Sequence, residues 1–409
     1  TRLQGDWSSD VCSSDLASLK LIVLGCCFLA ACQATAPVIN THLPSVVPGE
    51  FIVMLKSGSV GLEARTQVTI LNSFHINEFR ALHVKVDDAQ LAALREDSNV
   101  DVIEAEAWEF HTECTSQNTG ATIWGLSRTS SRSLPSWTGA TYDYTDADNG
   151  NGVDAYVLDT GIYLEHNDFG GRAVQGFVAP GQQAEGPGDN NGHGTHCAGT
   201  VGGTTYGVAK GVNLIEVKVL GRLGSGSTTD VVAGIDYVAG QHSSSRKSVM
   251  NLSLGMTGES TAVNNAMQAA LNAGVHAAVA AGNSNANACN YSPAMVEDAL
   301  TTVASNNVDG LPTFTNYGTC TDIIAPGNNI LSTYIGGPTA TASLSGTSMA
   351  APHVCGWVAR YLSSVSTNPS VTALKTILQD EATPDVINLG GKTGRSEERR
   401  VGKECRSRW

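Results

Sequence analysis

The spacing of apolar and polar residues divides the chain into two regions with different periods. Between residues 48 and 110, short stretches predict strands at 51–55, 81–86 and 99–106 and a helix at 87–97. Because strands and helix alternate over so short a length, we expect a small ferredoxin-like α+β unit here. A unit of this size buries little apolar surface, so we expect it to need a partner surface.

From about residue 115, longer apolar runs replace these short stretches. Runs that suit fully buried strands lie at 153–159, 213–220, 249–255 and 275–283, and helical stretches lie between them at 228–241 and 260–274. This alternation predicts an α/β fold, a doubly wound and mostly parallel sheet that helices cover on both faces. Such sheets bind ligands at the carboxyl ends of their strands, so the residues that follow each run are candidates for function.

Composition and charge narrow the classes of function. The 409 residues carry a net charge of −14, which argues against nucleic acid as a partner. A hydrophobic content of 41% is ordinary for a globular protein, and the length allows two or three domains.

Both ends of the chain read as foreign sequence. Residues 6–16, DWSSDVCSSDL, and residues 395–409, RSEERRVGKECRSRW, back-translate into a pair of sequencing-library adapters. We therefore interpret residues 1–16 and 395–409 as artefacts and exclude both from the predicted fold. The alternative for the tail is a basic arm that binds an acidic partner.

Residues 17–32 have the features of a secretory signal peptide. Lys20 supplies a positive charge, and the apolar run that follows is too short to span a membrane. The stretch LAAC, which ends at Cys32, resembles a bacterial lipobox, and ATA at 34–36 offers an ordinary cleavage site instead. Both alternatives predict export, with membrane attachment only through a lipid on Cys32. Residues 33–47 read as a linker.

Four side chains at the ends of predicted elements suggest one chemistry. Asp159 ends a buried strand, His193 lies in GHGTH, Asn283 closes the run 275–283, and Ser348 lies in GTS just before an apolar helix. A serine can attack, a histidine can take and return its proton, an aspartate can fix the histidine tautomer, and an amide can hold the oxyanion. The set therefore predicts nucleophilic catalysis.

Each of these residues also has a simpler interpretation. Asp159 and Asn283 suit turns, and the GTS of Ser348 suits a helix cap. His193 and His196 could be half of a metal site, but their spacing is three and no third ligand lies nearby. The glycine-rich loop 221–227 reads G-x-x-G-x-G, which departs from the nucleotide-binding pattern.

Several separated motifs together resemble the subtilases, in their proteinase K-like branch. The matching stretches are VLDTGI, NGHGTHCAGTVGG, VLGRLGSGS, MNLSLG, AAGNSNANACNYSPA and SGTSMAAPHV. The resemblance implies a subtilisin-like peptidase domain at 113–394 that lacks the family's last strand. It also implies an inhibitory propeptide at 48–112, with cleavage between Trp108 and Ser116 and Phe110 as the expected site. Two rivals are an inactive scaffold that binds peptides and a serine hydrolase that acts on esters.

The resemblance implies roles for particular residues. Asp159, His193 and Ser348 would form the triad, Asn283 the oxyanion hole, and His196 a structural contact. The substrate-binding residues would be Leu223, Gly224, Ser225, Gly226, Ser253, Leu254, Gly255, Ala280, Ala281 and Gly282. Small residues at 280–282 imply a roomy pocket and broad specificity, with aromatic or large aliphatic residues preferred before the cut bond. Substrates would be proteins and peptides, and the enzyme a secreted monomer.

The resemblance also implies a structural calcium ion and a disulfide. Calcium would take carbonyl oxygens from Pro293 and Met295 and the carboxylate of Asp322. Cys289 and Cys320 would form the disulfide. Of the five cysteines between residues 33 and 394, Cys197 would pack unpaired near His196, and the resemblance implies no partner for the other two, Cys114 and Cys355.

Overall fold

The computed structural model describes residues 35–39, 41, 46–57, 59, 68–76, 79–107, 115–243, 246–384, 386–389 and 399–400. The chain divides into two compact units, Thr1–His42 with Val46–Trp108, and Leu43–Ser45 with Glu109–Trp409. The predictions for the signal peptide, Cys32, Phe110 and Cys114 lie outside the described residues. Among the described helices, none is long and apolar enough to cross a membrane.

The first unit is a five-stranded sheet with a helix. Its elements are β1 (Val38–Ile39), β2 (Val46–Leu55), β3 (Thr69–Ile76), β4 (Phe79–Lys85), α1 (Asp88–Arg95) and β5 (Val100–Ala107). The strand order β1-β5-β2-β4-β3 places β2 between β5 and β4, as expected for a ferredoxin-like unit. Asp87 caps α1 by accepting a hydrogen bond from the main-chain N–H of Gln90, and the side chain of Gln90 accepts one in return.

The second unit begins with β6 (Thr115–Asn118), α2 (Trp124–Thr129), β7 (Thr141–Tyr144), η1 (Asp146–Asp148), β8 (Val153–Asp159), η2 (Asn167–Phe169), β9 (Ala173–Val178), η3 (Pro180–Gln182), α3 (His193–Gly202), β10 (Asn213–Lys218) and α4 (Thr228–Gln241). It continues with β11 (Lys247–Leu252), β12 (Met256–Thr257), α5 (Thr261–Asn272), β13 (His276–Ala280), η4 (Ala288–Asn290), β14 (Tyr291–Ser292) and β15 (Leu300–Ser305). The last elements are β16 (Ile323–Pro326), β17 (Ile330–Thr333), β18 (Thr341–Leu344), α6 (Thr347–Ser364), α7 (Val371–Glu381), β19 (Thr383–Pro384) and β20 (Arg399–Arg400).

A mostly parallel sheet forms the centre of the second unit. Its order is β19-β20-β16-β15-β13-β11-β8-β10-β9, and the β19–β20 pair alone among these neighbours is antiparallel. The predicted doubly wound α/β fold is therefore confirmed. After β8, the chain places β9 and β10 on one side of β8 and then β11 on its other side. The direction in which strands are added to the sheet therefore reverses at β8. The carboxyl ends of β8, β11 and β13 lie at this reversal, where such sheets bind ligands.

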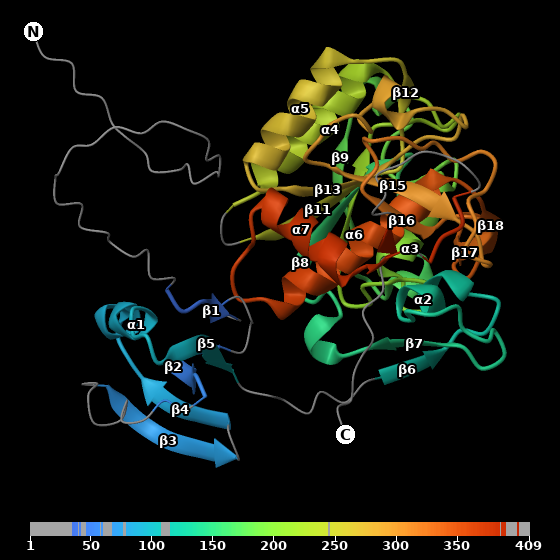
Figure 1. Ribbon diagram of the computed structural model, residues 1–409. Helices are drawn as coiled ribbons and strands as arrows, with labels where there is room; N and C mark the ends of the chain where they lie inside the picture. Colours follow the sequence, from blue (N-terminus) through green and yellow to red (C-terminus); the bar gives the residue numbers. More distant parts are fainter. Residues whose placement is uncertain are drawn as a thin grey trace, which may run out of the picture. The chain divides into compact units, whose positions relative to one another are not determined.

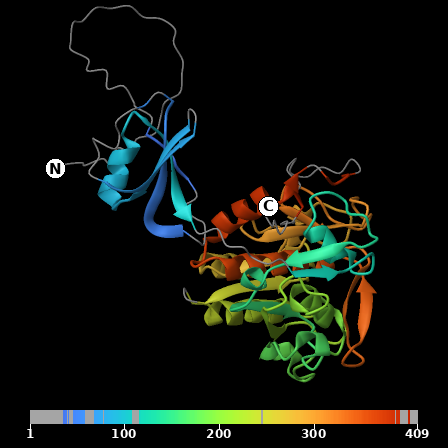
Figure 2. The ribbon, with the colours of Figure 1, turned by 90° about the horizontal axis from the view of Figure 1, so that it is seen from below.

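Helices cover both faces of this sheet, as Figures 1 and 2 show. One core cluster packs apolar residues of α3, α6 and α7 against the sheet. The other cluster packs α4 and α5 against the opposite face. The strands β8 and β13 are buried along their whole length because they lie between these two layers, which is why they read as continuous apolar runs.

The described residues at the end of the chain add a short strand to the edge of the sheet. Residues 395–409 were predicted to lie outside the fold, but Arg399–Arg400 forms the short strand β20. This strand pairs with β16 and β19 at the edge of the sheet. The interpretation of residues 395–409 as foreign sequence and the absence of the family's last strand both stay predictions.

Candidate active site

The buried carboxylate at the end of β8 contacts the histidine that begins α3. The side chain of Asp159 is fully buried, and its Oδ1 and Oδ2 lie 2.8 and 3.0 Å from Nδ1 of His193. Oδ1 also accepts a hydrogen bond from the main-chain N–H of Thr160 at 2.7 Å. A carboxylate held this way fixes the imidazole with its proton on Nδ1, which leaves Nε2 free to act as a base.

Two glycines allow α3 to approach the end of β8 closely. Gly192 precedes the helix at φ +104°, and a Cβ there would lie 2.4 Å from the ring of Tyr334. A Cβ on Gly194 would lie 2.2 Å from the carbonyl oxygen of Gly161. Larger residues at either position would push the helix, and His193 with it, away from Asp159.

Ser348 lies in the first turn of α6, as the sequence predicts. Its Oγ donates a hydrogen bond to the carbonyl oxygen of Ser253 at 3.1 Å, and Ser253 Oγ donates to the carbonyl oxygen of Ser348 at 2.7 Å. Within the described part of the chain, no hydrogen bond joins Ser348 Oγ to His193. Such bonds are often long in the absence of substrate and shorten when it binds.

Cys197 connects the histidine and the serine in space. Its Sγ lies 3.9 Å from Nδ1 of His193 and donates to the carbonyl oxygen of Ser348 at 3.3 Å. The four groups Asp159, His193, Cys197 and Ser348 therefore gather at one edge of the sheet.

Asn283 follows β13 and is oriented by the start of α6. Its Oδ1 accepts hydrogen bonds from N–H and Oγ1 of Thr347, at 2.8 and 3.0 Å. Because Oδ1 is held there, Nδ2 is the donor left for a ligand, in a pocket that Asn283 lines together with Ser348. The sequence did not single out Thr347, although its place just before Ser348 suits this task.

Burial and charge oppose each other at His193. Burial lowers the pKa of His193, but the Asp159 carboxylate outweighs this effect and the net pKa lies well above 6.5. Burial raises the pKa of the Cys197 thiol, so the thiol stays neutral beside the imidazole. The charge that stabilises a protonated His193 is therefore that of Asp159.

The other two titratable residues of GHGTHC, His196 and Cys197, are buried and carry no charge at neutral pH. Nε2 of His196 contacts the carbonyl oxygens of Ile330 and Ala342 at 2.9 and 3.1 Å, and burial lowers the pKa of His196 to about 4. Ligand atoms of Asp159, His193 and Cys197 lie within 4.8 Å of one another, as a metal would require. Metals bind the thiolate, and burial disfavours that form of Cys197.

Two pockets meet at the segment that follows β11. A pocket of about 340 Å³ is lined by His193, by Gly224, Ser225 and Gly226, and by Ser253, Leu254 and Gly255. A second pocket of about 200 Å³ is lined by the same segment 253–255, by Ala280, Ala281, Gly282 and Asn283, and by Ser348. Leu223 lies beside the first pocket in sequence, with 83% of its surface exposed. Apart from Leu223, the predicted substrate residues thus line the two pockets that contain His193 and Ser348.

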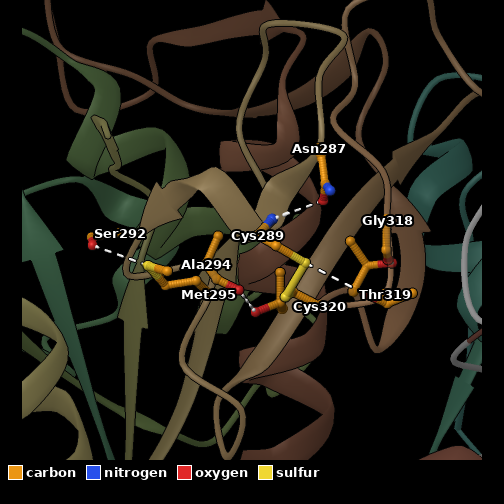
Figure 3. The surroundings of a disulfide bond; sticks show 10 residues. Asn287, Cys289, Ser292, Ala294, Met295, Gly318, Thr319 and Cys320 are labelled. Atoms are coloured by element: carbon orange, nitrogen blue, oxygen red, sulfur yellow. Dashed lines mark hydrogen bonds between the residues drawn. A yellow bond between two sulfur atoms is a disulfide. The ribbon is translucent and has the colours of Figure 1, made fainter. Parts of the chain in front are cut away.

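The structure joins Cys289 to Cys320, with their Cα atoms 5.3 Å apart (Figure 3). Asn287 Oδ1 accepts the main-chain N–H of Cys289, and Thr319 Oγ1 lies 3.5 Å from the Cys289 sulfur. Two further cysteines, Cys197 and Cys355, are buried and unbonded in the part of the chain that the structure describes.

Of the three expected calcium ligands, the carboxylate of Asp322 is already paired with a cationic side chain in this arrangement. Oδ1 of Asp322 lies 2.7 Å from the ammonium group of Lys375, and Oδ2 accepts the main-chain N–H of Thr301. The carbonyl oxygen of Pro293 accepts the N–H of Val296 at 3.0 Å. Met295 contacts Ser292 through its sulfur (Figure 3). A cation at Asp322 would have to displace Lys375.

The ammonium group of Lys375 lies among several oxygen atoms, of which Asp322 supplies one. This ammonium group also donates to the backbone carbonyls of Glu297 and Ala299, the latter at 3.3 Å. The carbonyl oxygens of Glu297 and Ala299 and the carboxylate of Asp322 thus surround the ammonium group of Lys375.

A doubly wound sheet whose strand ends gather a serine, a histidine, a buried aspartate and an amide defines the class of α/β serine hydrolases. Within that class, the chain belongs to the subtilase family, since the model of that family, peptidase S8, matches residues 150–402.

Known members of the family resemble the chain over most of its length. An extracellular serine proteinase of Thermus sp. (strain Rt41A) is 41% identical, with 91% of this chain and 95% of the relative covered. A subtilisin-like serine protease of Penicillium citrinum is 43% identical, with 79% and 72% covered. The crystal structure of a cold-adapted subtilisin-like serine proteinase matches with a TM-score of 0.62 and 40% identity, over 70% of this chain and 99% of that one. The chain is therefore a serine peptidase of the subtilase family.

Proposed function

We propose that the protein is an exported serine endopeptidase that cleaves peptide bonds with Ser348, His193 and Asp159. The observation that carries this proposal is the buried Asp159 carboxylate, whose two oxygens lie within 3.0 Å of His193 Nδ1. The position of Ser348 at the start of α6, across the same edge of the sheet, supports it.

Each residue has one task in the proposed reaction. Ser348 Oγ attacks the carbonyl carbon of the bond to be cut, while His193 Nε2 takes the hydroxyl proton and then gives it to the leaving amine. Asp159 stabilises the imidazolium that forms between these steps. Asn283 Nδ2 donates a hydrogen bond to the oxyanion, and Thr347 holds the amide in place for that contact.

The pockets suggest what the substrate is. An extended peptide would add its main chain to the segments 223–226 and 253–255, and such pairing is largely independent of sequence. The pocket of about 200 Å³, with Ala280, Ala281 and Gly282 in its lining, suits an aromatic or large aliphatic side chain before the cut bond. An ester hydrolase would have no use for two peptide-pairing segments.

The proposal includes synthesis as a secreted, self-processing zymogen. The first unit would act as the inhibitor, and cleavage would fall between Trp108 and Ser116. A lipid on Cys32, if added, would stay with the propeptide and free the mature enzyme, which we expect to be a monomer. The extracellular relative in Thermus supports export. Calcium belongs to the proposal only as a structural ion, and it has no step in the proposed reaction.

Hydrolysis of two matched substrates tests this function. A peptide anilide with phenylalanine before the cut bond should be cleaved by the wild type, and Ser348→Ala should lose at least about 10⁴-fold in kcat. The same anilide with aspartate before the bond should be a poorer substrate. Equal rates for wild type and Ser348→Ala would overturn the proposal.

A further inference from the structure

A buried lysine lies directly under the candidate active site. Lys218 ends β10, next to Asp159 in the sheet, and its side chain is fully buried. Its ammonium group donates to the carbonyl oxygen of Thr160 at 2.5 Å, which ties the chain just after Asp159. A buried ammonium is costly unless a negative group lies close by.

Glu185 supplies that negative group from a distant loop. Its Oε2 lies 3.7 Å from the Lys218 ammonium, and the Glu185 side chain is 27% exposed at the rim. The loop that carries Glu185 is fixed in turn, because Asp230 at the start of α4 accepts hydrogen bonds from Gly181 and Gln182. Glu185 is therefore held in place from two sides.

The same carboxylate oxygen also holds the segment that we expect to pair with substrate. Glu185 Oε2 accepts the main-chain N–H of Arg222 at 2.8 Å. The carbonyl oxygen of Arg222 accepts a hydrogen bond from Asn191 Nδ2 at 2.9 Å, and Asn191 Oδ1 accepts the N–H of His193. Both main-chain polar groups of Arg222 are thus fixed. Its N–H is held by Glu185, which pairs with Lys218, and its carbonyl oxygen is held by Asn191, which also contacts the first residue of α3.

We propose that Glu185, anchored by Lys218, is a positioning residue that sets the affinity for the substrate residues that precede the cut bond. This inference rests on the proposed function. A segment whose conformation is fixed beforehand loses less entropy when a peptide adds to it, so affinity rises. Residues 223–226 follow Arg222 directly and line the larger pocket beside His193. A substrate too short to reach that segment gains nothing from Glu185.

The test compares Glu185→Ala, Glu185→Gln and a control, Glu165→Ala, whose side chain is exposed. Each full chain acts on an anilide with four residues before the cut bond and on an anilide with one. Glu185→Ala should raise KM for the long substrate roughly tenfold, as expected for one lost hydrogen bond to a charged group. Its kcat should stay within about twofold of wild type, and the short substrate should be unaffected.

The glutamine variant separates positioning from general damage. Glu185→Gln keeps an oxygen for the Arg222 N–H, so it should recover most of the lost affinity, and Glu165→Ala should match wild type. An unchanged KM for the long substrate in Glu185→Ala would overturn the inference. Equal losses for both substrates would overturn it too, since they report damage to the fold. Failure of the wild type to cut either substrate would instead refute the proposed function.

Discussion

At the scale of single residues, two opposing effects act on the imidazole of His193. Burial of His193 favours the neutral ring that can accept a proton, and Asp159 favours the charged ring that forms once the proton arrives. Because both effects act on one imidazole, the same residue can accept and return a proton at moderate pH. Asp159 contributes both the orientation of the ring and the charge that stabilises it.

Replacing Asp159 by asparagine separates these contributions. We expect kcat of Asp159→Asn to fall by about 10⁴-fold, because an amide can hold the imidazole in the wrong tautomer. The measurement is the hydrolysis of a four-residue anilide at fixed pH. A variant with near wild-type kcat would contradict the role given to Asp159.

The same variant carries a pH signature. A general base works only when unprotonated, so kcat/KM of the wild type should rise with pH through the raised pKa of His193, above pH 6.5. Without the Asp159 charge, the rise should move to lower pH. An unchanged pH profile in the variant would mean that another group titrates.

At the scale of elements, burial on both faces explains what the sequence could predict. Strands β8, β10, β11 and β13 read as apolar runs because both layers of helices cover them, and α4 was predicted with its observed bounds. Strand β15 was missed because LTTVAS contains two threonines. Both are fully buried, and their hydroxyls donate to the carbonyl oxygens of Ala294 and Leu300.

Contacts between distant elements were the part that the sequence could not predict. The motifs brought Asp159, His193, Asn283 and Ser348 into one site, since each follows a predicted strand or begins a helix. The pairing of Lys218 with Glu185 joins a strand to an irregular loop, and no spacing marks it. The pairing of Asp322 with Lys375 likewise joins the residue just before β16 to α7, and it engages the carboxylate of the expected calcium site.

Because Lys375 is paired with Asp322, we predict that the stability of the wild-type protein does not depend on calcium at this site. The Asp322 side chain is only 4% exposed, so Lys375→Met leaves a buried carboxylate without its cation. In the presence of EGTA, we expect the free energy of unfolding of Lys375→Met to be about 3–5 kcal/mol below that of wild type. In calorimetry, added calcium should raise the melting temperature of Lys375→Met again. The melting temperature of wild type should stay unchanged.

Two features keep this test specific. Ser348→Ala in every chain prevents self-digestion, and Lys56→Met serves as the control because Lys56 is exposed. Equal melting temperatures for Lys375→Met and wild type in EGTA would contradict the assigned role.

His276, the first residue of β13, predicts a loss of stability in acid. Its side chain is 2% exposed, and neither ring nitrogen has a partner in the part of the chain that the structure describes. Burial, with a smaller contribution from His242, lowers the pKa of His276 to about 4. The unfolded chain, with a pKa near 6.5, therefore binds the proton first, and stability falls as pH drops from about 6.5 toward 4.

Through His276, the free energy of unfolding should fall by on the order of 3 kcal/mol between pH 7 and pH 4. Calorimetry at both pH values should show a smaller drop in melting temperature for His276→Leu than for the parent Ser348→Ala chain. His75→Leu, at an exposed position, is the control. An equal drop in both chains would show that other groups govern acid stability.

At the scale of the whole molecule, the chain contains two compact units of very different size. The second unit carries every candidate catalytic residue, and the first carries none of them. Residues 48–112 also read as a separate element in the sequence, joined to the peptidase domain near residue 113. The zymogen that we propose would account for this organisation, since an inhibitor must stay attached until the enzyme can remove it.

Self-processing of the full chain is the most direct test of the central claim that Ser348 is the nucleophile of a peptidase. Wild type and Ser348→Ala are incubated at equal concentration, and intact mass is followed over time. We predict that the wild type splits between residues 108 and 116 and that Ser348→Ala stays whole. Cleavage of Ser348→Ala at the wild-type rate, or a wild type that never splits, would contradict the account.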